Sequence, residues 1–417
     1  MAGAVVASRE PWTVRPPLAA AEAAELRQAM IFDYCKWDPQ VGDTATLCAH
    51  PLVLRASAAR ELVTAAEGLY AETLAVEAEL LARPPLLDQL ALSCAIRRVL
   101  PRSLAGTPTD AAGRIMRFDF HPTCEGWRVS EVNSDVPGGY VETCGLGRLL
   151  AGHYPDCQAS GDPVAAVVAA VLAAAGAGAH IGLVHATAYT DDRQAMVLLE
   201  RALRAAGGQP HLLAPDAVRW PGLRPAAIGP AGIQPLDALL RFFPAEWLPH
   251  LGWRQPWRAY FQPAAVPCLN PATALAMQSK RWALLWPRLH TPIPWWRRLM
   301  PESVEPRHVT GPEEGWVFKP ALGRVGEAVL IAGVDADPRA VRGWRYSLRR
   351  DPGSWVAQRR FVSTPWVAAD GVPRHVCLGV FVIAGRAAGI YGRAALQPLI
   401  DGSAQDVGVL WEDFDDE

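Results

Sequence analysis

The sequence predicts a mixed α/β fold, in which helices and strands alternate in one part of the chain and segregate in others. Residues 20–33 and 56–83 place apolar side chains at helical spacing. Residues 161–208 follow the order helix, strand, loop and helix, which is typical of a small α/β unit with a parallel sheet. From residue 316 onward, short runs with the character of strands dominate.

Composition limits the classes of function. Half of the 417 residues are hydrophobic and 20% are charged, which is enough for two or three packed subdomains. The formal charge of -2 gives no basic field, so we expect no nucleic-acid partner. Eight cysteines occur without a CxxC pair, which predicts reduced, mostly buried thiols and neither disulfides nor structural zinc.

The N-terminal and alanine-rich segments indicate a cytoplasmic protein without a membrane partner. The first apolar run is too short for a signal peptide and soon meets Arg9 and Glu10. Residues 163–184 are mostly alanine and glycine, and Gly176 and Gly178 interrupt them. We therefore expect a buried helix followed by a strand, and not a membrane span.

Element by element, the first hundred residues look mainly helical. Strands are then expected at 115–120 and 127–133, joined by the turn-rich residues 121–126. An alanine-rich helix, a strand at 180–185 and a helix at 192–206 follow, and residues 220–235 are expected to form a surface loop. Later strands are predicted at 316–319, 328–332, 355–361, 376–384 and 387–391. The acidic residues 412–417 suggest a solvated tail.

Four polar residues on the first two of these strands form a candidate metal site. Since strand side chains alternate between faces, Arg117 shares a face with Asp119, and Glu131 shares one with Asn133. Two carboxylates and an amide oxygen suit Mg²⁺, and Arg117 could face a phosphoryl group in transfer. On spacing alone, a solvated strand face with ordinary ion pairs is an equally open interpretation.

A lysine and two glycines form a second candidate site. Lys319 ends a strand, and the loop that follows contains Gly323 and Gly326. Glycines allow backbone N–H groups to approach phosphate oxygens, and the lysine adds a point charge. The order of residues differs from the P-loop, in which the lysine follows the glycines. Taken alone, the segment fits an ordinary hairpin better. The strand of Gln358 could meet an adenine edge, and Arg393, just past a strand, could neutralise a phosphate or a carboxylate. Taken alone, an edge strand and a surface arginine explain these two residues better.

The number of lysines is unusually small. Only three occur among the 40 lysines and arginines, namely Lys36, Lys280 and Lys319. A site that needs a compact ammonium does not accept the broader guanidinium, so each lysine is a candidate for a binding role. Chance survival is the alternative explanation. Lys36 is expected to lie outside the proposed site.

Other catalytic chemistries lack their signatures. The chain has no GxSxG elbow, no HExxH and no recognisable cysteine nucleophile. The turn after the strand at 180–185 lacks the glycines of a dinucleotide-binding fingerprint.

Several short motifs, read in order, resemble the glutathionylspermidine synthase family. They are Arg117-Phe-Asp119, Glu131-Val-Asn133, residues 243–248, Asn270-Pro, Gln278-Ser-Lys280, Lys319-Pro-Ala-Leu-Gly323-Arg324, Gln358, and residues 379–383 with 388–393. The similarity covers most of the chain from about residue 30. It implies a circularly permuted ATP-grasp fold, in which metal ligands precede the nucleotide-binding strands, with a small Rossmann-like preATP-grasp subdomain.

The resemblance also implies roles for individual residues. Asp119, Glu131 and Asn133 would bind the Mg²⁺ ions that bridge the phosphates of ATP. Six residues would contact the nucleotide: Lys280, Lys319, Gly323, Arg324, Gly326 and Gln358. Arg117 and Arg393 would stabilise the acyl phosphate and the tetrahedral intermediate.

The implied organisation has three parts. Residues 1–160 would hold a helical region and the metal-ligand strands, residues 161–265 the preATP-grasp-like unit, and residues 266–417 the ATP-binding strands and lid. The implied reaction joins a peptide-like carboxylate to a polyamine-like amine, with ATP as the source of activation, in a protein that could form a homodimer. After Arg393 the family often has a glutamate, but here Ala394 follows. The alternatives are the same chemistry on another acid and amine in specialised metabolism, or a degenerate protein that binds ATP without ligating.

Overall fold

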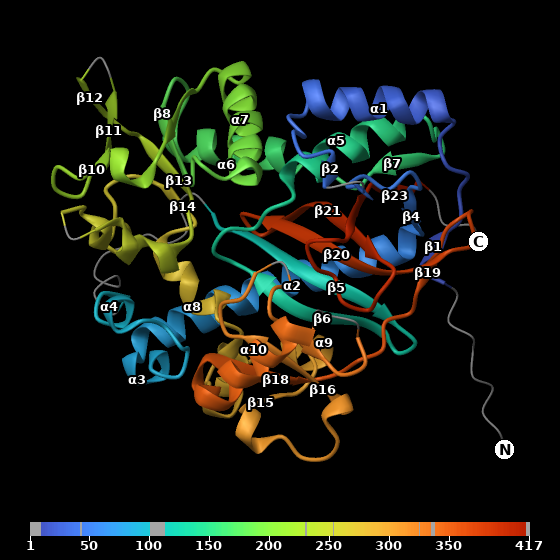
Figure 1. The fold of residues 1–417 in the computed structure, drawn as a ribbon. Helices are drawn as coiled ribbons and strands as arrows, with labels where there is room; N and C mark the ends of the chain where they lie inside the picture. The colour runs from blue at the N-terminus through green and yellow to red at the C-terminus, as the bar shows by residue number, and fades with distance from the viewer. Residues whose placement is uncertain are drawn as a thin grey trace.

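The computed structural model describes residues 10–41, 44–100, 113–229, 232–252, 254–324, 326–334 and 338–413. A long antiparallel sheet lies at the centre of the molecule, with a parallel α/β unit and a smaller antiparallel sheet beside it (Figure 1). This arrangement confirms the predicted mixed α/β fold.

The central sheet carries the two strands on which the candidate metal ligands lie. Its strand order is β22-β21-β20-β5-β6, and β19 pairs with β20. The strands are β5 (Ile115–Thr123), β6 (Gly126–Asn133), β19 (Trp366–Val367), β20 (Pro373–Ile383), β21 (Arg386–Ala395) and β22 (Gln405–Val407). Strands β5 and β6 are longer than predicted, because only Cys124 and Glu125 separate them. Arg393 lies within β21 and not past its end.

The two faces of the central sheet have different neighbours. Phe118 and Phe120 of β5 belong to the same hydrophobic core as Leu69 and Val76 of α2 (Ala56–Ala82). Because successive side chains of a strand point to opposite faces, Arg117 and Asp119 must point away from α2. The long helix thus closes one face with apolar packing, and the other face remains for polar chemistry. Helix α5 (Tyr140–Ala151) lies on that second side and contacts β21 (Figure 1).

The α/β unit contains the predicted parallel sheet. Its strand order is β14-β13-β8-β9, and all three pairings are parallel. The strands are β8 (His180–His185), β9 (Gln209–Leu213), β13 (Ala238–Phe242) and β14 (Cys268–Leu269). Helix α6 (Pro163–Ala175) begins where Asp162 accepts a hydrogen bond from the N–H of Ala165 at 2.9 Å. Helix α7 (Thr190–Ala205) presents Leu199 and Leu203 to the same core as Val167 and Val171 of α6.

A smaller antiparallel sheet holds Lys319 and Gln358. Its strands have the order β15-β18-β16-β17, with β15 (Ser303–Val304), β16 (Trp316–Pro320), β17 (Leu330–Ile331) and β18 (Trp355–Arg359). Trp316, Phe318 and Trp355 form its core. Helix α10 (Pro338–Arg350) covers this core through Val341 and Trp344. This helix was not predicted from the sequence.

A peripheral sheet joins distant parts of the chain. Its strands are β1 (Trp12–Thr13), β4 (Leu52–Leu54), β23 (Val409–Glu412) and β7 (Cys157–Ala159), in that order. Glu412, expected in a solvated tail, is buried in β23 and accepts a hydrogen bond from the Thr13 hydroxyl at 2.9 Å. The expectation is therefore wrong for Glu412, and residues 414–417 of that tail lie outside the described residues.

The remaining elements are short or peripheral. They are α1 (Ala20–Phe32), α3 (Pro84–Leu87), α4 (Cys94–Arg97), α8 (Leu275–Gln278), α9 (Pro294–Leu299), β2 (Gln40–Val41), β3 (Thr44–Ala45), β10 (Val218–Arg219), β11 (Ala226–Gly229) and β12 (Gly232–Pro235). Strands β11 and β12 pair with each other, so the loop expected at 220–235 is wrong in its second half. Along the described part of the chain, no helix combines the length and the apolar character that crossing a membrane requires.

A buried ion pair joins the central sheet to the α/β unit. Asp135, directly after β6, lies 2.5 Å from a guanidinium nitrogen of Arg241 on β13, and neither side chain is exposed at all. The second Asp135 oxygen accepts a hydrogen bond from the N–H of Ala245 at 3.0 Å. Asn270, after β14, bonds both the N–H and the carbonyl of Ile115, at 2.9 and 3.0 Å. These contacts fix the distance between the two sheets.

We expect Arg241→Met to destabilise the protein strongly, by about 3–5 kcal/mol, because it leaves the Asp135 carboxylate buried without its partner. Denaturant unfolding monitored by tryptophan fluorescence measures the change. The matched control is Arg224→Met, which breaks an ion pair of the same 2.5 Å length, to Asp237, at a site where Arg224 is 52% exposed. That variant should lose no more than about 1 kcal/mol. Equal losses in the two variants would contradict the role assigned to burial.

Candidate active site

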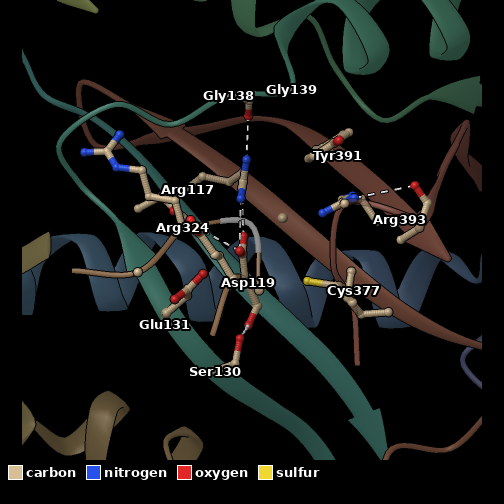
Figure 2. Close-up of a pocket in the computed structure, with 18 of the residues that line it drawn as sticks. Arg117, Asp119, Ser130, Glu131, Gly138, Gly139, Arg324, Cys377, Tyr391 and Arg393 are labelled. Carbon is tan, nitrogen blue, oxygen red and sulfur yellow. Dashed lines mark hydrogen bonds and ion pairs between the residues drawn. The ribbon is translucent and has the colours of Figure 1, made fainter. Parts of the chain in front are cut away.

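A large cavity lies where the central sheet, the smaller antiparallel sheet and the α/β unit meet. Its volume is about 710 Å³. Its walls include β5 and β6 of the central sheet, Lys319 and Gln358 of the smaller sheet, and the start of α7. Figure 2 shows the polar side chains that point into it from the central sheet.

Every residue that the sequence selects as a candidate lines this cavity. They are Arg117, Asp119, Glu131, Asn133, Lys280, Lys319, Gly323, Arg324, Gly326, Gln358 and Arg393. Five separate stretches of sequence, residues 117–133, Lys280, residues 319–326, Gln358 and Arg393, therefore converge on one space.

Asp119 is the centre of a network on β5 and β6. Arg117 donates two hydrogen bonds to the Asp119 carboxylate, at 2.8 and 3.0 Å, and Asn133 donates another at 3.0 Å. The register explains this grouping, because Arg117 lies opposite Asn133 and Asp119 lies opposite Glu131. Burial alone would lower the pKa of Arg117, but Asp119 raises it, so the guanidinium remains charged. A further Arg117 bond, 2.6 Å long, reaches the carbonyl of Gly138 (Figure 2).

Two lysines converge on Glu131. The ammonium of Lys280 lies 2.8 Å from a Glu131 oxygen and also donates to the carbonyl of Gly323 at 2.7 Å. Burial alone would raise the pKa of Glu131, but Lys280 and Lys319 outweigh it and lower the value. Burial, opposed by Glu131, lowers the pKa of Lys319 to about 8. The carboxylate is therefore ionised, and the Lys319 proton is held less tightly than in water.

A β-bulge positions Lys319. The register of β5 and β6 shifts after Asp119, so Phe120 pairs with Val129, and Ser130 has no place in the ladder. The Ser130 carbonyl instead accepts a hydrogen bond from the Lys319 ammonium at 3.2 Å. Gln358, on the neighbouring strand, accepts another at 2.7 Å. Lys319 thus spans the two antiparallel sheets.

The glycine-containing loop reaches two neighbours. Gly326 has a φ of +68°, and a Cβ atom there would lie 2.6 Å from the carbonyl oxygen of Ile400, so a larger residue does not fit. Arg324 bonds Glu246 at 3.2 Å, approaches Asp135 at 3.4 Å and lies over the ring of Trp247. The loop is therefore anchored to the α/β unit on one side and to residues near the C-terminus on the other.

Arg393 faces the cavity from β21, across from Arg117 (Figure 2). Its Nε atom is buried and has no hydrogen-bond partner among the described residues. A buried donor of this kind is costly unless an acceptor is bound, which fits an anionic ligand.

The residues present also fit a magnesium ion shared with a phosphate ligand. Asp119 and Glu131 are adjacent carboxylates that face the cavity, and Asn133 adds an amide. The described residues contain no group of three or more His, Cys, Asp or Glu side chains that could hold a metal by themselves. A small protein set is what Mg²⁺ uses when substrate phosphates complete its coordination.

The sequence reading missed several residues of the cavity wall. Lys36, expected outside the site, is buried and lines the cavity. So do Glu142, Asp191, Asp192 and Asp406. The rarity of lysine was the available signal for Lys36. The four carboxylates carried no signal, because they lie on elements that only the fold brings together.

Comparison with known proteins identifies a structure of similar fold and the family of this chain. A glutathione synthetase-like effector (GSS30) from Globodera pallida, in its apoform, matches with a TM-score of 0.59 and 10% identity, over 93% of this chain and 96% of that one. At that identity the likeness concerns the fold alone. A putative gamma-glutamylcysteine synthetase from Methylobacillus flagellatus KT matches with a TM-score of 0.42 and 12% identity, over 82% and 88% of the two chains, which carries no argument. No curated protein sequence matches.

The order of the strands agrees with the predicted permuted ATP-grasp fold, since β5 and β6 precede β16 and β18 along the chain. A model of the glutathionylspermidine synthase preATP-grasp family matches residues 36–410. The chain therefore belongs to that family, and this membership supports a ligase-like function.

Proposed function

We propose that the protein is an ATP-dependent ligase that joins a carboxylate to an amine through an acyl phosphate. One observation carries the proposal: a single cavity brings together the cations Arg117, Lys280, Lys319 and Arg393 and the carboxylates Asp119 and Glu131. Cations suit the phosphates and the acid, and the carboxylates suit magnesium. A site for the acid alone would not need both sets.

The first step activates the acid. A carboxylate oxygen attacks the γ-phosphorus of ATP, the bond from that phosphorus to the bridging oxygen breaks, and ADP leaves. Charge develops on the transferred phosphoryl group, and fixed cations in a buried site stabilise such charge without reorganising. Arg117 is bonded to Asp119 and to the carbonyl of Gly138 at the cavity wall, so the cation is already in the site before substrate binds.

Asp119, Glu131 and Asn133 would hold the magnesium. When bound, the ion neutralises phosphate charge and orients the γ-phosphoryl group for attack. In this structure, Glu131 forms an ion pair with Lys280, and Asp119 forms one with Arg117. Binding of the nucleotide would let both cations turn to phosphate oxygens and release the carboxylates to the metal.

The second step forms the amide. The amine nitrogen attacks the acyl carbon, the bond from that carbon to the phosphate oxygen breaks, inorganic phosphate leaves and the nitrogen loses a proton. Arg117 and Arg393 face the same space and would stabilise the negative oxygen of the tetrahedral intermediate. Carboxylates elsewhere in the wall, at Asp191 and Asp192, suit a substrate that carries ammonium groups. A peptide-like acid and a polyamine-like amine therefore remain the proposed substrate classes.

The products test the reaction type. With an acid and an amine that support turnover, nucleotide chromatography should show ADP and an equal amount of inorganic phosphate, because phosphorus is transferred to the acid. AMP and pyrophosphate would instead indicate an acyl adenylate and remove this mechanism. Binding of ATP without any turnover across a broad panel of acids and amines would favour the degenerate, non-ligating alternative.

We expect Glu131→Gln to lower turnover by roughly a hundredfold or more. The amide keeps the size of the side chain but removes the negative charge that would bind the metal and that pairs with the lysines. ADP release at saturating Mg²⁺ measures the loss. The control is Glu125→Gln in the turn of the same hairpin, where the side chain is 72% exposed. A Glu131→Gln variant as active as that control would show that the metal assignment is wrong.

We expect Lys319→Arg to weaken ATP binding and slow turnover by about tenfold or more, although the charge is kept. The ammonium fits between the Ser130 carbonyl and the Gln358 amide oxygen, at 3.2 and 2.7 Å, and a planar guanidinium is broader. Calorimetric titration with ATP and steady-state kinetics measure both effects. All three lysines line the cavity, so the control is the reverse exchange at an exposed position, Arg386→Lys, where the arginine is 83% exposed. If both variants behave as wild type, the ATP site lies elsewhere.

A further inference from the structure

Lys36 is a buried ammonium surrounded by carboxylates. Its Nζ atom lies 2.6 Å from Glu142, 3.0 Å from Asp406 and 3.3 Å from Asp38. The lysine side chain is 4% exposed, and those of Glu142 and Asp406 are 9% and 8% exposed. Opposite charges raise the pKa of Lys36 despite its burial, so it stays protonated.

This cluster adjoins the proposed reaction centre. Asp406 on β22 is the register partner of Arg393 on β21. Its other oxygen accepts a hydrogen bond from the Tyr391 hydroxyl at 2.7 Å, and Arg117 lies over the Tyr391 ring, 5.2 Å from its centroid. Gly139 makes room for that ring, because a Cβ atom there would lie 2.6 Å from it. One residue, Asp406, thus separates Lys36 from Arg393, and two residues, Asp406 and Tyr391, separate it from Arg117.

A structural tie alone does not account for the charges. One ammonium cannot neutralise three carboxylates, and Asp191 and Asp192 add two more to the same cavity wall. Among the described residues, neither of these aspartates lies within ion-pair distance of a cation. Burial raises the pKa of Asp192 to about 7 against the opposing charge of Arg324, and burial and the neighbouring Asp38 raise the pKa of Asp191 against that of Lys36. A bound ammonium would favour the ionised form of both carboxyl groups, so this part of the wall can take up a further cation.

On the basis of the proposed function, we propose that Lys36 is a built-in ammonium that fills the cation subsite between Glu142 and Asp406. The amine substrate is then a short diamine, with one nitrogen reacting at Arg117 and Arg393 and one distal ammonium bound by Asp191 and Asp192. A longer polyamine brings an additional ammonium, which must lie beside Lys36 or displace it. Repulsion between this ammonium and that of Lys36, at short distance in a buried site, disfavours binding of the longer polyamine.

The order of affinities tests this inference. An acidic wall without Lys36 binds the trivalent spermidine more tightly than the divalent propane-1,3-diamine, on charge alone. We expect the wild type to show the reverse order in calorimetric titrations without ATP. Lys36→Met should raise the affinity for spermidine by about tenfold or more, which is the effect expected from removing one close repulsion between two ammonium groups. This variant should then bind spermidine more tightly than propane-1,3-diamine. The affinity for the diamine should change less.

The control variant is Arg148→Met, which removes an exposed cation from α5, the helix that carries Glu142. It should keep the order of the wild type. A Lys36 that acts only as a structural tie would give Lys36→Met a lower melting temperature with no preference for spermidine, and this result would overturn the inference. If that variant does not fold, the wild type still decides, because tighter binding of spermidine than of the diamine would also overturn it.

The binding measurements need no turnover, so they separate this inference from the proposed ligase reaction. A wild type that prefers the diamine but forms no ADP would contradict the reaction and support the role of Lys36. Normal ADP formation with spermidine as the preferred amine would support the reaction and contradict the role of Lys36.

Discussion

The buried pair of Asp135 and Arg241 is the contact on which the geometry of the cavity depends. It lies where the last residues of β6 leave the central sheet, and both side chains are fully buried. Such a pair is costly to desolvate and costly to break, so its value lies in fixing one arrangement of the sheets. Asp135 also approaches Arg324 of the glycine-containing loop at 3.4 Å. One carboxylate thus links the central sheet, the α/β unit and the loop that would cover the nucleotide.

The polar groups of the cavity are paired with one another in the absence of substrate. Arg117 bonds Asp119, Lys280 bonds Glu131, and Arg324 bonds Glu246. Each pair joins a group suited to phosphate with a group suited to a cation or metal. A nucleotide with its magnesium could therefore exchange partners with every pair at once, and no buried charge would be left alone at any stage. The pairs keep the site charged and ordered before binding.

The extent to which the sequence predicts this structure follows from the range of each interaction. Periodicity predicts α2, β5 and β6, and the order of helix, strand and helix indicates the parallel sheet, because those patterns are local. The i, i+2 spacing places Arg117 with Asp119 and Glu131 with Asn133, and the register confirms that both pairs share one face. Helix α10 was not predicted because its own sequence is rich in arginine. Strands β11 and β12 were not predicted because they lie in a segment rich in proline and glycine. The β-bulge at Ser130 and the burial of Lys36 depend on partners far along the chain, which no local pattern encodes.

The distribution of lysine now has a physical explanation. The chain uses arginine for nearly all of its cations, and the three lysines line one cavity and are each at least nine-tenths buried. At each of them several acceptors converge on a single point: three carboxylates at Lys36, Glu131 and the Gly323 carbonyl at Lys280, and Ser130 and Gln358 at Lys319. An ammonium has three donors on one atom and satisfies such a point, whereas a guanidinium spreads its donors across a plane. Arginine serves on the surface and also at Arg117 and Arg393 of the same cavity, but the three points where the lysines lie suit the compact cation. A residue type that composition makes rare is therefore found where geometry leaves no substitute, and Lys36 belongs to that set although no motif contains it.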